Sequence, residues 1–168
     1  SRDTAKWGSS VYTLGAGRLA QSGGKVHYST SGTVTDNDWA SYKAHGSVAP
    51  YNINWSVRLK VNVPAKSLSS GQEVEMGLRV ENQEDTRDYV GLWLGLPSSI
   101  RDLNSDLGVN GTDSSSTPAP FTTSLTSAVL QLRWDVASTT MHWEYDADET
   151  DNEWVWESLG SVNLGSGV

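Results

Sequence analysis

The chain has 168 residues, enough for one domain that buries roughly 70% of its unfolded surface, and its lack of cysteine excludes disulfides and thiolate metal sites. A net charge of −8 argues against nucleic acid and anionic membranes as partners, because both attract basic surfaces. Eight Trp and six Tyr stand against a single Phe, which favours stacking on sugar rings over plain core filling, with compositional drift as the alternative.

The ends of the sequence favour a module of a larger protein. It begins SRDTAKWG and ends NLGSGV, with no initiator Met, no signal peptide and no apolar run long enough to span a membrane. We expect a single domain over residues 1–168, monomeric and cut from a longer secreted or cell-surface chain, with no membrane insertion.

The first fifty residues contain short candidate strands. They are SVYTL, GRLAQSG, KVHYST and WASYKA, and a Gly-Gly turn separates the second from the third. The polar segment TDNDWASY carries Trp39 and Tyr42, which form either a loop-borne platform for a ligand or a plug under the edge of a sandwich. Asp36 and Asp38 precede them as candidate metal ligands.

Two long alternating strands follow. In INWSVRLKVNVPA, the apolar side chains from Ile53 to Val63 share one face, Arg58 and Lys60 lie on the other, and Pro64 ends the ladder. In EVEMGLRVEN, Val74 to Val80 alternate inward and Arg79 outward. The turn residues between the two segments predict that they form a hairpin or lie as near neighbours.

The stretch DYVGLWLGL has two different faces. Val90, Leu92, Leu94 and Leu96 predict a core face, while Tyr89, Gly91, Trp93 and Gly95 share the other. Either a ligand ring occupies the space that the glycines leave beside Trp93, or neighbouring strands and the following segment fill it. The region from Pro97 to Thr123, which contains NGTDSSSTPAPF, is predicted to be a long exposed loop.

The last third predicts a hairpin and two more strands. Apolar and polar residues alternate in VLQLRWDV and MHWEYD. Trp134 and Trp143 share a face with the apolar residues of these strands, which assigns them to the core, and Trp55 is assigned to the core on the same ground. EWVWESL and SVNL are the final candidates; Trp154 and Trp156 share a face, and the pattern leaves open whether that face is core. Roughly ten short strands separated by turn residues, with no helical period, predict an all-β antiparallel sandwich or jelly roll.

The order of these segments resembles concanavalin A-like (LamG-like) jelly-roll domains of bacterial secreted proteins. The resemblance runs from about Leu19 to Leu164 and rests on GRLAQSGGKVHYSTSG, TVTDNDWASY, two long alternating strands and the LRWDV…MHWEYD hairpin, which an acidic turn and a Trp follow. It implies one concave and one convex sheet, carbohydrate binding on the concave sheet or the edge loops, and frequently a structural calcium. Some members are glycoside hydrolases or polysaccharide lyases, and many are non-catalytic.

Catalytic motifs are absent from the sequence. Hydrolases of the resembled family carry two carboxylates in an E.D..E arrangement, which the available acidic residues do not match: Glu73, Glu75, Glu81, Glu144 and Asp146. There is no nucleophile elbow, H-E-x-x-H or phosphate-binding glycine loop. A lyase cluster built from His142, Arg133, Arg79 and Tyr89 stays open, but we expect no catalysis.

Calcium is the expected cofactor, because clustered carboxylates repel one another unless a cation neutralises them. DADETDNE offers Asp146, Asp148 and Asp151 as ligands, and Asp36 with Asp38 forms a second candidate set. The alternative is a solvated acidic turn. The three histidines lack a spacing that would indicate zinc.

The predicted ligand site combines aromatic and basic side chains that face away from the core in their strands. If the strands that carry these side chains lie in one sheet, the side chains form a strip that fits an anionic sugar. If the strands belong to opposite sheets, their shared outward direction does not bring the side chains together. The strip contains Arg58, Arg79, Tyr89, Trp93, Arg133 and His142. We therefore expect a non-catalytic carbohydrate-binding module. The alternatives are a glycan-binding, peptide-binding or spacer domain of a large adhesin and, less favoured, a lyase or hydrolase.

Overall fold

The computed structural model describes eleven ranges of the chain: 11–14, 17–23, 25–30, 39–42, 51–63, 73–81, 88–97, 101–109, 112–115, 121–148 and 153–165. All regular structure in these ranges is β-strand, so they hold no helix that could cross a membrane. Contacts divide the chain into two compact units, Ser1–Val48 and Ala49–Val168. The single domain expected from the sequence stays a prediction.

The N-terminal unit contains two antiparallel strand pairs. β1 (Val11–Leu14) pairs with β4 (Trp39–Tyr42), so Trp39 and Tyr42 lie at the two ends of a strand. β2 (Gly17–Ser22) pairs with β3 (Lys25–Thr30), and Gly23 between them has a φ of 56°, a conformation that favours glycine. The strand pair predicted around the Gly-Gly turn is confirmed.

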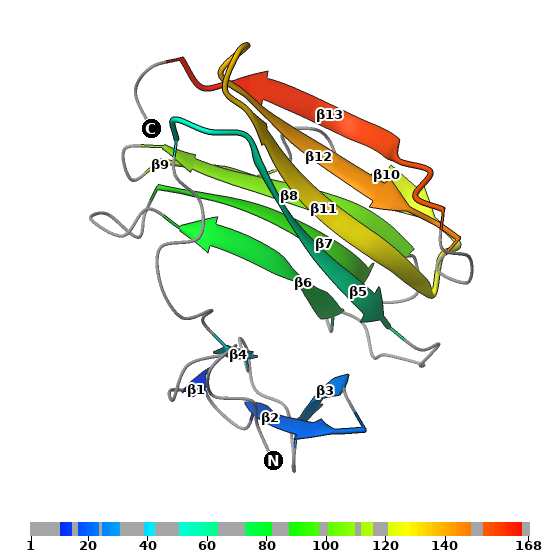
Figure 1. Ribbon diagram of the computed structural model, residues 1–168. Coiled ribbons are helices and arrows are strands. Elements are labelled where there is room, and N and C mark those ends of the chain that lie inside the picture. Colours follow the sequence, from blue (N-terminus) through cyan, green and yellow to red (C-terminus); the bar gives the residue numbers. More distant parts are fainter. Residues whose placement is uncertain are drawn as a thin grey trace. The chain divides into compact units, whose positions relative to one another are not determined.

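The C-terminal unit is an antiparallel β-sandwich, as predicted. One sheet, here called the β5 sheet, has the order β13-β12-β11-β5, and the other, the β7 sheet, has the order β10-β8-β7-β6 with β9 also paired to β8. Figure 1 shows the two sheets as separate layers. The bounds are β5 Trp55–Asn62, β6 Glu73–Glu81, β7 Tyr89–Pro97, β8 Arg101–Val109, β9 Thr112–Ser115, β10 Phe121–Thr123, β11 Ser127–Asp135, β12 Thr140–Asp146 and β13 Glu157–Asn163.

The core lies between these sheets and follows the period-two pattern of the sequence. Leu92 and Leu94 of β7 are fully buried opposite Leu130 and Leu132 of β11 in one apolar cluster. Trp143 of β12 is also fully buried, and its indole Nε1 donates a hydrogen bond of 2.8 Å to the carbonyl oxygen of Gly91 in the other sheet. The core assignments of Trp134 and Trp143 are confirmed, and Trp55 packs half-buried against the same cluster.

Two expectations about individual segments need correction, and a third is decided between its two alternatives. β5 and β6 do not form a hairpin, because each belongs to a different sheet, and they lie as near neighbours, which is the other arrangement that the sequence predicts. The long loop predicted after Pro97 contains β8, β9 and β10 instead. β8 was missed because its inward positions include Arg101 and Ser105 beside Leu103 and Leu107, a weak apolar alternation. The two final strands are one strand, β13, which begins after Trp156.

The space beside Trp93 is filled from within the β7 sheet. A Cβ atom on Gly91 would lie 3.0 Å from Trp93 Nε1, and one on Gly77 would lie 2.6 Å from Trp93 Cε3, so the indole lies over these two glycines. Its Nε1 donates to Asp106 Oδ2 at 2.8 Å. A Cβ atom on Gly95 would meet Asp102 Oδ1 at 2.5 Å. The glycines therefore accommodate neighbouring side chains of this sheet.

Gly77→Ala is expected to lower the free energy of unfolding by about 1–3 kcal/mol, because the added methyl group collides with the β7 backbone as well as with the Trp93 ring. Urea denaturation of the variant measures the loss. Ser161→Ala, on the exposed side of β13, is the matched control and should change stability by no more than about 0.5 kcal/mol. Equal midpoints for Gly77→Ala and wild type would contradict the close approach of β6 and β7.

Candidate functional site

A row of polar side chains crosses the outer face of the β5 sheet. Arg58, Gln131 and Glu144 occupy directly paired positions on β5, β11 and β12, and the alternation that buries their neighbours directs all three outward. Arg58 Nε donates to Gln131 Oε1, and Gln131 Nε2 donates to Glu144 Oε2. Gln131 is only 1% exposed and Glu144 9%, so these two members of the row are desolvated, whereas Arg58 is exposed. The hydrogen bonds of the row hold each planar group in a fixed orientation.

Arg133 completes this network as a bidentate partner of Glu144. Arg133 Nη2 lies 2.7 Å from Glu144 Oε1, and Arg133 Nε lies 3.1 Å from Glu144 Oε2. Burial alone would raise the pKa of Glu144, but hydrogen bonds from Arg133 and Gln131 outweigh it and the pKa lies below its ordinary value. The hydrogen bond with Glu144 raises the pKa of Arg133 despite some desolvation. Both groups are therefore charged at neutral pH.

The lowered pKa of Glu144 predicts acid sensitivity. A carboxylate with a lowered folded-state pKa adds stability above its unfolded-state pKa and loses that contribution as the pH falls through the folded-state value. The thermal midpoint of the wild type should fall more steeply from about pH 5 to about pH 3 than that of Glu144→Gln, which has no charge to lose. Circular dichroism melts measure both slopes, and parallel slopes would contradict this role of Glu144.

Two stacked indoles lie beside the network. The ring centroids of Trp154 and Trp156 are 5.6 Å apart with an interplanar angle of 11°. The guanidinium carbon of Arg58 lies 5.3 Å from the first centroid and 5.1 Å from the second, within cation–π range. Trp154 is 51% exposed, whereas Trp156 is half-buried. An open aromatic surface thus adjoins the fixed polar row.

The segment that carries these indoles is anchored to the same sheet. It connects β12 to β13, and the backbone amide of Val155 donates to Asp146 Oδ2 at 3.2 Å. Asp146 Oδ1 accepts the amide of Asp148 at 3.0 Å. Val129 and Asp146 are buried, although the alternation of side chains along their strands directs them outward. Asp146 therefore holds the start and the end of the connection against the outer face.

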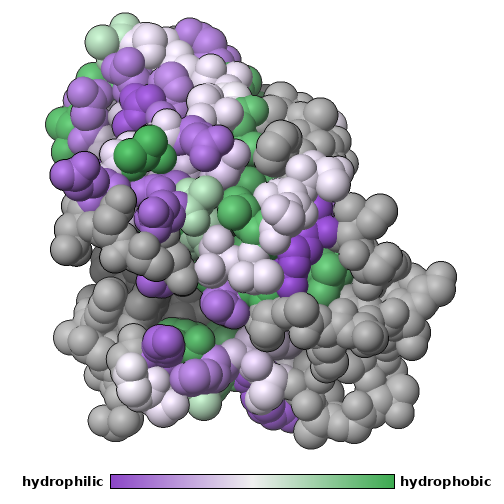
Figure 2. Space-filling model, turned by 90° about the vertical axis from the view of Figure 1, so that its right-hand side faces the viewer, coloured by the Kyte–Doolittle hydropathy of each residue, from purple (hydrophilic) through white to green (hydrophobic). Residues whose placement is uncertain are grey.

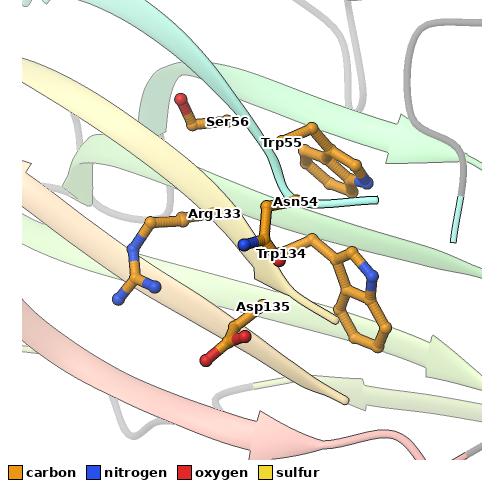
Figure 3. Close-up of a pocket in the computed structure, with 6 residues that line it drawn as sticks. All are labelled: Asn54, Trp55, Ser56, Arg133, Trp134 and Asp135. Carbon is orange, nitrogen blue, oxygen red and sulfur yellow. The ribbon is translucent and has the colours of Figure 1, made fainter. Parts of the chain in front are cut away.

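A pocket of about 450 Å³ extends the network at the end of the sheet. Figure 3 shows its two indoles on one side and the Arg133 guanidinium pointing away from them. Several polar groups here hold the following turn: Asp135 accepts from Ala137 and Ser138, and Asn54 accepts from the amide of Val136. The lining residues are Asn54, Trp55, Ser56, Arg133, Trp134 and Asp135.

The aromatic and basic residues that the sequence directs outward are divided between the two sheets. Arg133 and His142 lie on the outer face of the β5 sheet with Arg58, at adjacent positions of β11 and β12. Arg79, Tyr89 and Trp93 lie on β6 and β7 of the other sheet. There the Arg79 guanidinium carbon lies 3.6 Å from the centroid of Tyr89, and Arg79 also pairs with Glu81 at 3.0 Å. The strands therefore belong to opposite sheets, which is the second of the two arrangements left open by the sequence, and no continuous strip forms.

The structure describes two of the five predicted metal ligands. Asp146 uses both carboxylate oxygens to accept backbone amides, and Asp148 is exposed. Asp36, Asp38 and Asp151 lie outside the described residues. Within the described ranges no three His, Asp or Glu side chains are grouped as a metal site would require. Calcium stays a prediction. For Trp39 and Tyr42 the structure places the backbone in β4 and leaves the predicted ligand role untested.

The surface of the described residues is mostly polar. On the face shown in Figure 2, hydrophilic and intermediate residues predominate, and hydrophobic residues occur in small groups among them. Exposed large apolar side chains in the described ranges include Tyr51, Ile53, Trp154 and Val155. Trp154 and Val155 belong to the segment beside the polar network, and Tyr51 and Ile53 precede β5.

The sequence did not assign several residues of this site. The pattern does not decide whether Trp154 and Trp156 belong to the core or the surface, and it offers Glu144 only as a candidate catalytic carboxylate. It predicts an outward position for Gln131 and no role. Two signals pointed to the site: a Trp-x-Trp pair that directly follows an acidic turn, and a glutamine at the centre of a strand whose other face is wholly apolar.

Comparisons with known proteins leave the site to be interpreted from its own geometry. No family model, curated protein or solved structure matches the chain. The sandwich follows from the structure itself, and the concanavalin A-like resemblance rests on the order of segments in the sequence.

Proposed function

We propose that the chain is a non-catalytic carbohydrate-binding module of the concanavalin A-like type and that the outer face of the β5 sheet is its binding surface. The observation that carries this proposal is the half-exposed Trp154 ring beside the fixed row of Arg58, Gln131 and Glu144. A sugar ring has an apolar C–H face and a rim of hydroxyl groups. An open indole supports the first, and the exposed guanidinium of Arg58, which the buried Gln131–Glu144 pair holds in place, hydrogen-bonds the second.

The state of Glu144 favours binding over catalysis. A retaining glycosidase needs two carboxyl groups about 5–5.5 Å apart, one of them able to donate a proton. Glu144 accepts hydrogen bonds from both Arg133 and Gln131, and its lowered pKa keeps it ionised at neutral pH. A carboxylate saturated in this way positions the Arg133 and Gln131 side chains and has no proton to donate to a leaving group. A secreted or cell-surface location and calcium near the acidic turn belong to the same proposal.

Affinity electrophoresis through gels that contain single soluble polysaccharides tests the function. The proposal expects retardation by at least one polysaccharide, relative to a gel without glycan. Repeating each run with a chelator, together with thermal melts, tests calcium: a bound ion predicts a lower melting temperature once it is removed. Unchanged mobility in every gel, with and without added calcium, would contradict the proposal.

A further inference from the structure

The proposed site has a cationic edge on strand β5. Arg58 and Lys60 are exposed and face outward two residues apart, and Arg133 lies on the neighbouring strand. Arg133 already pairs with Glu144. Arg58 uses its Nε on Gln131, and among the described residues its two terminal nitrogens have no hydrogen-bond or ion-pair partner. Within the part of the chain that the structure describes, these nitrogens can bind a ligand at the rim of the indole pair.

The chemistry of that available group selects one kind of partner. The guanidinium presents parallel N–H donors that match the two oxygens of a carboxylate. Its central carbon lies 5.3 Å from the centroid of Trp154, so a sugar stacked on that ring brings a carboxylate on its edge toward Arg58. Gln131 fixes the guanidinium plane through Nε, which reduces the entropy lost when the ligand binds.

The charges around Arg58 permit an anionic ligand on a chain of net charge −8. In the paired row Gln131 is neutral, and the charge of Glu144 is compensated by Arg133 at 2.7 Å. Repulsion from more distant carboxylates is screened beyond about 8 Å at physiological ionic strength. The contact at Arg58 is thus governed by its nearest partners.

We propose that the ligand is an acidic polysaccharide whose rings carry carboxylates, and that Arg58 is the residue that selects it. This inference rests on the proposed carbohydrate-binding function and adds the class of sugar. Arg58 binds the ring carboxylate, Trp154 supports the ring, and the buried Gln131–Glu144 pair holds the Arg58 guanidinium in place.

Calorimetry with matched ligands tests the inference. The probes are oligosaccharides of polygalacturonate and of alginate, each beside its carboxyl-reduced form, which has the same backbone without the charge. The wild type should bind at least one acidic form roughly 10- to 100-fold more tightly than its reduced form. Arg58→Gln should weaken binding of the acidic form roughly 5- to 50-fold more than binding of the reduced form, so that the preference falls to about twofold, and Arg58→Lys should keep an intermediate preference.

Lys25→Gln is the control for net charge, because it removes the same charge from an exposed position on β3. It should leave the preference unchanged. Equal affinity for the acidic and reduced forms, or a preference that persists in Arg58→Gln, would overturn the inference and leave the carbohydrate-binding proposal standing. The gels described above decide that proposal separately, since they include neutral polysaccharides.

Discussion

Trp143→Ala is expected to lower the free energy of unfolding by about 3–5 kcal/mol, the largest effect of any single substitution considered for this chain. The indole is fully buried in the core of the sandwich. Its Nε1 also satisfies the carbonyl oxygen of Gly91 in the opposite sheet at 2.8 Å. Truncation leaves a cavity and removes the hydrogen bond to the Gly91 carbonyl oxygen, and these costs add.

Urea denaturation separates the two costs. Trp143→Phe keeps most of the apolar volume but removes the N–H donor, so it should be destabilised by about 1–3 kcal/mol, less than the alanine variant. Trp154→Ala is the control for loss of a tryptophan, and because its ring is 51% exposed it should cost about 1 kcal/mol or less. Comparable losses for Trp143→Ala and Trp154→Ala would contradict the assignment of core and surface.

Trp154→Ala is expected to weaken binding of a retarding glycan by about 2 kcal/mol, roughly 30-fold in Kd, while the fold stays intact. The ring is the exposed member of the stacked pair, and its loss removes the platform and one side of the Arg58 contact. Titration of purified variants by calorimetry measures the change. Near-ultraviolet circular dichroism checks that the core is preserved.

Two further variants make this test specific. Tyr51→Ala removes an aromatic side chain that is 75% exposed and outside the polar network, so it should leave the affinity unchanged. Trp93→Ala examines the site predicted from the sequence on the β7 sheet. A loss of binding in Trp93→Ala together with wild-type affinity in Trp154→Ala would move the site to that sheet and contradict the proposal.

The alternation of side chains was sufficient to predict the long strands and much of the core. Leu92, Leu94, Leu130 and Leu132 occupy the inward positions that a period of two assigns to them, and all are fully buried. Pairing was harder to predict, because contacts between strands distant in the sequence leave no local signal. β5 pairs with β11 across more than sixty residues, so the nearby β6 appeared to be its natural partner.

The candidate site was predictable only in its components. The alternation of side chains correctly predicts that Arg58, Arg133 and His142 face outward. The same alternation also directs Arg79 and Trp93 outward, but these two residues lie in the other sheet. Trp154 and Trp156 precede β13, in a connection without strand periodicity, and their position depends on Asp146 and Arg58. Such tertiary contacts decide which aromatic residues stay exposed, and a linear pattern does not contain them.

The most direct test of the binding surface is nuclear magnetic resonance of the indole N–H groups. The chain has eight tryptophans, whose signals can be assigned by single Trp→Phe variants and followed during titration with a glycan that retards the protein in gels. The account predicts that the Trp154 and Trp156 signals shift with ligand concentration, while those of Trp143 and Trp93 stay in place. Shifts confined to Trp93, with Trp154 and Trp156 unchanged, would contradict it.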